Sequence, residues 1–298
     1  MIGEVLLAWG EARRRDLPWR RTRDPWAILV SEVMLQQTQT SRVIPSWHAF
    51  LERFPDAPTT AAAPVGDVID QWRGLGYNRR AVALHATAVA VTDRHGGTVP
   101  GDLDALLALP GVGPYTARAV LAFAYEQDVG VLDTNAARVL ARAVAGRPLA
   151  PAEARRLADD LVPPGTGWAW NQAVLDLGAT VCTSRRPRCP SCPLQAAGCC
   201  AWDGRTPDPA IGTAGASGRQ AAFAGSDRQG RGRLVAALRR GPVPAGEVPA
   251  VAGWPLEPGR VDRVVAALLA EGLAQRAADG TLHLPGRAPC RERLATLR

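Results

Sequence analysis

The sequence predicts an all-α fold for residues 1–202, and three observations support this prediction. Apolar residues recur there at three- and four-residue spacing, which is the period of an amphipathic helix. Residues that end helices separate the periodic segments, among them Pro64, Gly96-Gly97 and Pro110. We find no convincing run in which apolar and polar residues alternate as they do along a half-buried strand. We therefore expect this part of the chain to contain helices alone.

The segments with the helical period follow one another closely. They are Trp26–Thr40, Val65–Trp72, Ala81–His95, Leu103–Leu107, Tyr115–Tyr125, Thr134–Val144, Ala152–Leu161 and Trp168–Ala179. Residues 203–232 differ, because Gly, Ala, Ser, Pro and Arg dominate them and bury little surface. The sequence therefore predicts one helical domain in residues 1–202, followed by a flexible linker over residues 203–232.

Regular structure is predicted to resume in residues 233–298. The expected elements are helices at Arg233–Arg240, Val243–Val251 and Pro258–Glu271, and strands at Ala274–Arg276 and Thr281–Leu284. Asp279-Gly280 separates the two strands and is a typical hairpin turn. Three helices with a small hairpin are typical of a winged-helix domain. A merely compact tail that packs on the main domain fits the same pattern.

The composition favours a polyanionic partner. The chain has 298 residues and a net charge of +7, and all 35 of its basic residues are arginine. Arginine binds phosphate well but cannot form a Schiff base, so chemistry that needs a lysine nucleophile is excluded. No run approaches the ~20 apolar residues of a membrane helix. Because Met1–Gly10 has no positive charge before its apolar patch, we expect no secretory signal and a cytoplasmic protein.

Five of the six cysteines are clustered, and only Cys290 stands apart. Six residues separate Cys182 from Cys189, two separate Cys189 from Cys192, and six or seven lead to Cys199 or Cys200. Four thiolates from one compact loop suit a [4Fe–4S] cluster, whereas a structural zinc usually takes two close pairs. The spacing favours the cluster and leaves zinc open. The loop also contains Arg185, Arg186 and Arg188, which could bind phosphate or compensate an anionic cluster.

A glycine-containing turn joins two of the predicted helices. In Leu109-Pro110-Gly111-Val112-Gly113, the glycines allow close approach of the backbone, and the N–H groups that begin the next helix favour an anion. Such a turn could hold DNA phosphate without reading sequence, but any tight turn between two helices could use the same glycines. Asp133 follows Gly113 by twenty residues and precedes a predicted helix. By itself, an aspartate in that position is most simply an N-cap.

Ser31-Glu32-Val33-Met34-Leu35-Gln36-Gln37-Thr38-Gln39 contains a second acidic candidate. Glu32 lies among Val30, Val33 and Met34 and is therefore expected to be partly buried. Burial favours the protonated form of a carboxyl group and so permits proton donation near neutral pH. By periodicity alone, a solvated helix glutamate is the better interpretation.

Together these motifs resemble the endonuclease III and adenine glycosylase superfamily. The resemblance rests on the order of the Leu109–Gly113 hairpin, Asp133 and the cysteine cluster, whose last gap is longer here than in the family. Ser31–Gln39 and the upstream Leu17-Pro18-Trp19-Arg20 are similar to adenine glycosylase motifs in particular. The resemblance covers about residues 1–202. It implies a two-lobed helix-hairpin-helix fold with a [4Fe–4S] loop over residues 182–200, the cysteine loop, followed by a small winged-helix-like region.

The resemblance also implies how the reaction is carried out. Glu32 would protonate adenine at N7, Asp133 would stabilise or capture the sugar cation, and Tyr115 and Asn135 would support that site. Tyr115 stands where the bifunctional members carry a catalytic lysine. The base would be removed without strand cleavage, after it has been flipped out of the duplex.

Further residues are implied to contact DNA or metal. Gln37 would act as a wedge, and Thr38, Leu75 and Tyr77 would lie near the opposing lesion. Trp19, Arg20 and Gln172 would line the adenine pocket, and Gly111 and Gly113 would contact phosphate. Asn78 replaces a tyrosine that is common in the family. The metal ligands would be Cys182, Cys189, Cys192 and Cys199 or Cys200, with Cys199 slightly favoured because its spacing departs less from that of the family.

The resulting hypothesis is a monomeric bacterial adenine DNA glycosylase, associated with the nucleoid, that acts on double-stranded DNA. Its substrates would be A:8-oxoguanine or A:G mispairs. The tail is too short and too helical for the Nudix-like domain of many such enzymes, although it could grip DNA through Arg231, Arg233, Arg239 and Arg240. Two alternatives stay open, namely a glycosylase for another base and a noncatalytic iron–sulfur regulator that binds DNA.

Overall fold

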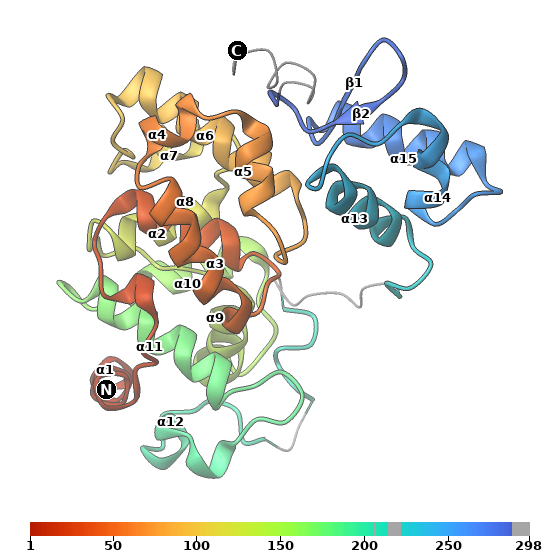
Figure 1. The fold of residues 1–298 in the computed structure, drawn as a ribbon. Helices are drawn as coiled ribbons and strands as arrows, with labels where there is room; N and C mark the ends of the chain where they lie inside the picture. Colours follow the sequence, from red (N-terminus) through yellow and green to blue (C-terminus); the bar gives the residue numbers. More distant parts are fainter. Residues whose placement is uncertain (205–206, 214–221, 288–298) are drawn as a thin grey trace. The chain divides into compact units, whose positions relative to one another are not determined.

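The computed structural model describes residues 1–204, 207–213 and 222–287 (Figure 1). By its internal contacts it divides into two compact units. The first unit is formed by residues 1–29, 101–108 and 112–219. The second is formed by residues 30–100, 109–111 and 220–298, of which Cys290 and the rest of 288–298 lie outside the described residues. All regular elements within residues 1–202 are helical, so the all-α prediction for this part is confirmed.

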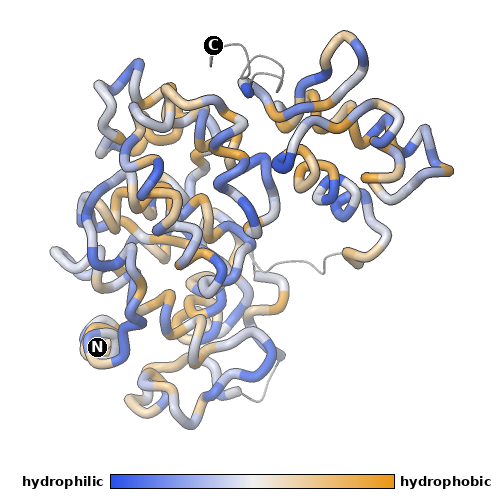
Figure 2. The backbone as a smooth tube through the Cα atoms, viewed as in Figure 1, coloured by the Kyte–Doolittle hydropathy of each residue, from blue (hydrophilic) through white to orange (hydrophobic). Residues whose placement is uncertain are grey.

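Helices α1, α9 and α11 form the core of the first unit. Leu6 of α1 packs with Trp170, Val174 and Leu177, which recur at helical spacing along α11. Hydrophobic and hydrophilic positions are interspersed along the helices (Figure 2). The elements of this unit are α1 (Ile2–Arg13), η1 (Pro18–Arg20), the start of α2 (Pro25–Leu35), α7 (Leu103–Leu107), α8 (Pro114–Phe123), α9 (Thr134–Val139), the π-helix η2 (Leu140–Ala145), α10 (Pro151–Asp160), α11 (Gly167–Thr180), η3 (Cys189–Ser191) and α12 (Pro193–Ala196).

Helix α6 organises the second unit, because α4 and α5 both pack against it. Phe50 and the fully buried Trp72 meet edge to face, with ring centroids 6.1 Å apart. This unit contains the end of α2, α3 (Thr40–Arg53), α4 (Ala57–Ala62), α5 (Val65–Gln71), α6 (Arg79–His95), α13 (Asp227–Leu238), η4 (Ala245–Glu247), α14 (Val248–Ala252), α15 (Pro258–Ala270), β1 (Gln275–Arg276) and β2 (Leu282–His283).

The tail contains the predicted three helices and hairpin. Strands β1 and β2 pair antiparallel, and Gly280 between them takes a φ of +84°. Val243 adds an isolated bridge to Leu282, as a third strand does in a winged-helix arrangement. The boundary predicted for the linker is wrong at its C-terminal end, because α13 already begins at Asp227. The composition of residues 203–232 does not predict that a helix begins here, because Gly230 and Gly232 are poor helix formers.

The predicted helix Trp26–Thr40 is wrong at its C-terminal end. Helix α2 ends at Leu35, and Gln37 takes a left-handed φ of +54° before α3 begins at Thr40. Apolar periodicity does not detect a single left-handed residue between two helices. Helices α1, α3, α4 and α12 were not among the predicted segments. Within the described residues, no helix is both long and apolar enough to cross a bilayer.

Candidate active site and metal centre

Asp133 caps the first turn of α9. Its Oδ1 accepts hydrogen bonds from the backbone N–H groups of Asn135 at 2.8 Å and Ala136 at 2.7 Å. Its Oδ2 accepts a third from Nδ2 of Asn135 at 2.7 Å. The N-cap interpretation is therefore confirmed, and Asn135 is bound directly to the predicted catalytic carboxyl group. The cap places a half-buried carboxyl group at the positive end of a helix.

Burial governs the protonation of this carboxyl group. Withdrawal from water raises the pKa of Asp133 above its usual range, although the hydrogen bonds from Ala136 and Asn135 act to lower it. A carboxylate in this environment is poorly solvated, so a cation that formed beside it would be strongly attracted. Perturbed groups of this kind are concentrated at functional sites.

The backbone that leads to Asp133 is fixed from two sides. Asn171 of α11 accepts a hydrogen bond from the N–H of Val131 at 2.7 Å. Gly130 donates to Oδ1 of Asp159 at 2.8 Å and accepts from Nε of Arg118 at 2.9 Å, while Arg118 and Asp159 also form an ion pair. Because α8 and α9 both pack on α11, the same helix supports the elements that carry Tyr115 and Asp133.

A chain of hydrogen bonds connects Asp133 with the cysteine loop. Arg138 donates to Oδ1 of Asn135 at 2.8 Å, to the carbonyl of Gly178 at 2.7 Å and to that of Cys182 at 2.7 Å. Gly178 lets α9 and α11 approach closely, since a Cβ there would lie 2.7 Å from Cβ of Asn135. The position of the loop and that of the carboxyl group are thereby coupled through Arg138.

Four cysteines line one cavity with an empty volume of about 340 Å³, open solvent included. They are Cys182, Cys189, Cys192 and Cys200. Leu177, Val181, Leu194 and Trp202 give the cavity an apolar lining. Cys199 is not among the lining residues, and its Sγ lies 3.4 Å from the carbonyl oxygen of Ala197 instead. Within the described residues, no three His, Cys, Asp or Glu side chains are arranged to hold a single metal ion.

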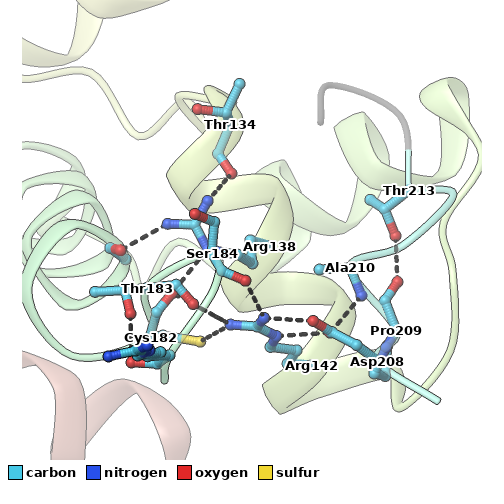
Figure 3. Close-up of polar contacts among 12 residues, drawn as sticks. Thr134, Arg138, Arg142, Cys182, Thr183, Ser184, Asp208, Pro209, Ala210 and Thr213 are labelled. Atoms are coloured by element: carbon cyan, nitrogen blue, oxygen red, sulfur yellow. Dashed lines mark hydrogen bonds and ion pairs between the residues drawn. The ribbon is translucent and has the colours of Figure 1, made fainter. Parts of the chain in front are cut away.

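Arg142 braces the cysteine loop from inside the unit (Figure 3). Its buried guanidinium donates to both carboxylate oxygens of Asp208, at 2.8 and 2.5 Å, and to the carbonyl of Thr183 at 2.8 Å. It also lies 3.5 Å from Sγ of Cys182. Asp208 belongs to the segment predicted as a linker, yet this ion pair fixes it to the first unit. The donor set and the ordered loop fit a group held by four thiolates.

Glu32 is buried in α2 of the second unit. Its exposed fraction is 4%, and Ser31 and Met34 beside it are fully buried. The alternative of a solvated surface glutamate is therefore wrong, because the tertiary packing covers this face of the helix. Glu32 and Asp133 belong to different units, and a shared cavity for their carboxyl groups stays a prediction.

Arg80 connects the end of α2 with the Gly74–Tyr77 turn. Its guanidinium is buried and donates to six carbonyl groups and one hydroxyl, those of Val33, Met34, Gln36, Leu75, Gly76, Tyr77 and Thr38. Burial lowers the pKa of Arg80 to about 10, so it is still charged at neutral pH. The predicted lesion-reading residues Thr38, Leu75 and Tyr77 are thus brought together around one arginine.

Two residues predicted to meet DNA protrude in unusual backbone conformations. Gln37 is exposed with a φ of +54°, and Tyr77 is 43% exposed with a φ of +45°. Residues with side chains seldom adopt such angles, and they do so mostly where function or tight packing requires it. Leu75 is buried beneath the turn, and its carbonyl accepts a hydrogen bond from Oγ1 of Thr38 at 3.2 Å.

The predicted hairpin lies between α7 and α8. Gly111 takes a φ of +76°, and a Cβ there would lie 2.7 Å from Cβ of Ala83. Gly113 is the N-cap of α8, is exposed, and has open space around the position of a Cβ. The turn therefore needs Gly111 for packing, whereas Gly113 keeps the N–H groups at the start of α8 accessible to an anion.

Trp19, Arg20 and Gln172, the residues predicted for the adenine pocket, are all buried. Arg20 forms a two-point ion pair with Asp176, at 2.7 and 2.8 Å, and this pair ties η1 to α11. Gln172 lies one helical turn before Asp176. Contact of these residues with a base stays a prediction, and the structure adds a structural role for Arg20.

Sequence analysis missed the residues that hold the candidate site in place, namely Arg80, Arg138, Arg142, Asp176 and Gly178. An arginine or aspartate on an otherwise apolar helix face was an available signal for Arg142 and Asp176. The suggested grip of the tail on DNA is also restricted, because Arg231 pairs with Glu271 and Arg239 binds Ile69 and Asn78. Of the four arginines predicted to bind DNA, Arg233 and Arg240 are the exposed ones.

The fold and the hairpin correspond to a known class of proteins. The profile of the HhH-GPD superfamily of base excision DNA repair proteins matches residues 30–164. The structure of a thermostable thymine-DNA glycosylase is similar with a TM-score of 0.64 and 30% identity, over 67% of this chain and 94% of that one. A trapped covalent intermediate of endonuclease III with DNA gives a TM-score of 0.57 and 25% identity, over 65% and 90%.

Proteins named adenine DNA glycosylase match at higher identity. The one from Mycolicibacterium smegmatis is 46% identical over 94% of this chain and 95% of its own length. That from Mycobacterium tuberculosis is 45% identical over 94% and 92%. The human protein is 41% identical over 64% of this chain and 37% of its own length. The chain therefore belongs to the adenine DNA glycosylase family.

Proposed function

We propose that this protein is a monofunctional adenine DNA glycosylase that removes adenine opposite 8-oxoguanine or guanine in duplex DNA. The observation that carries the proposal is the setting of Asp133, a half-buried carboxyl group held by Asn135 at the start of α9. Membership of the adenine DNA glycosylase family supplies the substrate class. The protein acts as a monomer in the bacterial cytoplasm.

Glu32 is the acid of the proposed reaction. The adenine is first flipped out of the duplex, at a cost of roughly a few kcal/mol. Glu32 then gives a proton to adenine N7 while the bond between N9 and C1′ breaks, and the bonding electrons leave with the base. Support for this role comes from the burial of Glu32, since a carboxyl group withdrawn from water favours its protonated form and therefore still has a proton to donate nearer neutral pH.

Asp133 faces the cation that the departing base leaves on the sugar. Its negative charge stabilises that cation. A water molecule then adds to C1′ and gives its proton to the Glu32 carboxylate, which lost its own proton to the base, and this completes hydrolysis. Asn135 keeps the carboxylate oriented, and Tyr115 on α8 supports the same site. Because the chain contains no lysine, no lysine amine is available to form a Schiff base, and the sugar–phosphate strand stays intact.

A [4Fe–4S] cluster fits the four cysteines that share a cavity, Cys182, Cys189, Cys192 and Cys200. Cys200 is the proposed fourth ligand, because it lines the cavity and Cys199 does not. When bound, the cluster holds the loop that presents Arg185, Arg186 and Arg188 to DNA phosphate. Arg138 and Arg142 fix the position of this loop relative to α9.

An excision assay on defined duplexes tests the proposal. We expect the wild type to release adenine opposite 8-oxoguanine, more slowly opposite guanine, and not opposite thymine. E32Q and D133N should bind the same duplexes while excision falls by about 100-fold or more. Strand breaks should appear only after alkali treatment. Near-normal turnover by D133N would contradict the role of Asp133, and tight mispair binding without turnover by the wild type would instead indicate a noncatalytic regulator.

A further inference from the structure

The C-terminal end of the tail is attached to α5. The N–H of Gly66 donates to the carbonyl of Pro285 at 2.9 Å. Arg287 donates to Asp67 at 2.7 Å and to Asp70 at 3.0 Å. Gly66 is required for this approach, because a Cβ there would lie 2.6 Å from the carbonyl oxygen of Pro285. These contacts all lie within the second unit, which includes the Gly74–Tyr77 turn that is predicted to lie near the opposing lesion.

Arg239, at the end of α13, extends from the tail towards that turn. Its guanidinium donates twice to the carbonyl of Ile69, at 3.2 and 2.9 Å, and once to Oδ1 of Asn78 at 3.0 Å. The next residue, Arg240, is exposed. The two neighbouring arginines therefore differ, because Arg239 uses its donors within the protein and Arg240 points to solvent.

Asn78 occupies the junction between the turn and α6. It stands at the N-cap of α6, where an asparagine side chain commonly accepts a hydrogen bond from the first turn of the helix. Here the side chain makes no such bond, and its Oδ1 accepts from Arg239 instead. The residue directly before it is Tyr77, in a left-handed conformation that must be held by its surroundings.

The turn is thus held from two directions. Arg80 binds the carbonyls of Leu75, Gly76 and Tyr77 from within the helical lobe, and Arg239 binds Asn78 from the tail. Adenine DNA glycosylases from Mycolicibacterium smegmatis and Mycobacterium tuberculosis match over 94% of this chain. The uncovered 6% is shorter than the tail, so these relatives share at least most of it.

We propose that Arg239 is a positioning residue that fixes the Gly74–Tyr77 turn by holding Asn78. Through this turn, the tail determines how well the protein distinguishes 8-oxoguanine from guanine opposite adenine. The inference rests on the proposed function, in which this turn lies beside the opposing base. The tail then acts on discrimination through the turn, without itself contacting the lesion.

Single-turnover excision by the full-length protein tests the inference. The quantity to measure is the ratio of the adenine excision rate opposite 8-oxoguanine to that opposite guanine. R239Q and N78A should each lower this ratio by about three- to tenfold, and the double variant should lower it no further, because both remove the same contact. N78D keeps an acceptor for Arg239 and should retain the ratio. R240Q is the matched control, since it removes a neighbouring exposed charge and should leave the ratio unchanged.

The outcomes separate this inference from the proposed function. If the wild type excises adenine from neither duplex, the proposed function itself is wrong. If R239Q and N78A excise adenine normally and keep the wild-type ratio of the two excision rates, only the positioning role is overturned. An equal loss of binding to every duplex in R239Q and R240Q, at an unchanged ratio, would also overturn it and assign the tail to nonspecific DNA binding. If R239Q does not fold, the comparison of N78A with N78D decides.

Discussion

Asp133 is both a helix cap and a carboxyl group that its surroundings withdraw from water. Three hydrogen bonds hold it, two of them from the backbone, and these favour its ionised form. Burial opposes that effect and raises the pKa of Asp133. The residue is thus held in one orientation at a cost in solvation. Fixed, poorly solvated charge is what stabilises a cation that exists only in the transition state.

The raised pKa of Asp133 predicts a specific dependence of stability on pH. D133N keeps an N-cap of similar quality but cannot titrate. Because the folded state binds the proton of Asp133 more tightly than the unfolded chain does, the stability of the wild type relative to D133N is greatest at acidic pH. It should fall as the pH rises from the unfolded pKa of about 3.9 through the raised folded pKa.

Urea unfolding of both proteins at a series of pH values from acidic to neutral measures this difference. The control is a buffer series at constant ionic strength, which keeps surface charges equally screened. A stability difference that increases with pH would mean that the hydrogen bonds outweigh burial and that the pKa of Asp133 is lowered.

At the level of elements, the packing of α9 on α11 positions the candidate site. Gly178→Ala should leave most of the fold intact but force Asn135 away from α11, because the new Cβ would lie 2.7 Å from Cβ of Asn135. We expect excision to fall by about tenfold or more, since Asn135 orients the Asp133 carboxylate. Single-turnover rates on A:8-oxoguanine duplexes measure the effect.

Gly259→Ala is the matched control for this substitution. Gly259 also lies in a helix, α15, but a Cβ there meets nothing within 4 Å. Both alanines should favour helix formation by up to about 1 kcal/mol. Equal excision by the two variants would show that the close approach at Gly178 does not govern the site.

The cysteine loop predicts a difference between two adjacent residues. Cys200 lines the cavity with the other three cysteines, whereas Sγ of Cys199 lies near the carbonyl oxygen of Ala197. C200S should therefore purify with much less iron and a lower melting temperature, and C199S should resemble the wild type. Iron and sulfide analysis of both proteins measures this. The reverse result would make Cys199 the fourth ligand.

Local patterns predicted the helices and the hairpin because these depend on nearby residues, whereas the resemblance to the superfamily gave the two acidic candidates their roles. They missed contacts between residues far apart in the chain, such as the ion pair of Arg20 with Asp176 and that of Arg142 with Asp208. No local signal tells which distant carboxylate an arginine will meet. The left-handed conformation of Gln37 was missed for a similar reason, because the contacts of Arg80 around it are tertiary.

At the scale of the whole molecule, the charge surplus is unevenly distributed. Many arginines are neutralised within the protein, such as Arg20 by Asp176 and Arg287 by Asp67. Arg185, Arg186 and Arg188 on the cysteine loop are exposed, and they form no ion pair within the described part of the chain. A polyanion would therefore meet concentrated positive charge at this loop.

The salt dependence of DNA binding tests this distribution. Affinity for an undamaged duplex should fall steeply with salt, because each neutralised phosphate releases about 0.9 counterions. Replacing Arg185, Arg186 and Arg188 by Gln should make the slope of log K against log salt less steep by about one for each arginine that contacts phosphate.

The control for this triple variant is R94Q, which removes a charge from the exposed end of α6. Iron content must stay at the wild-type level in the triple variant, which shows that the loop is intact. An unchanged slope in that iron-replete protein would mean that the arginines compensate the charge of the cluster and do not bind DNA.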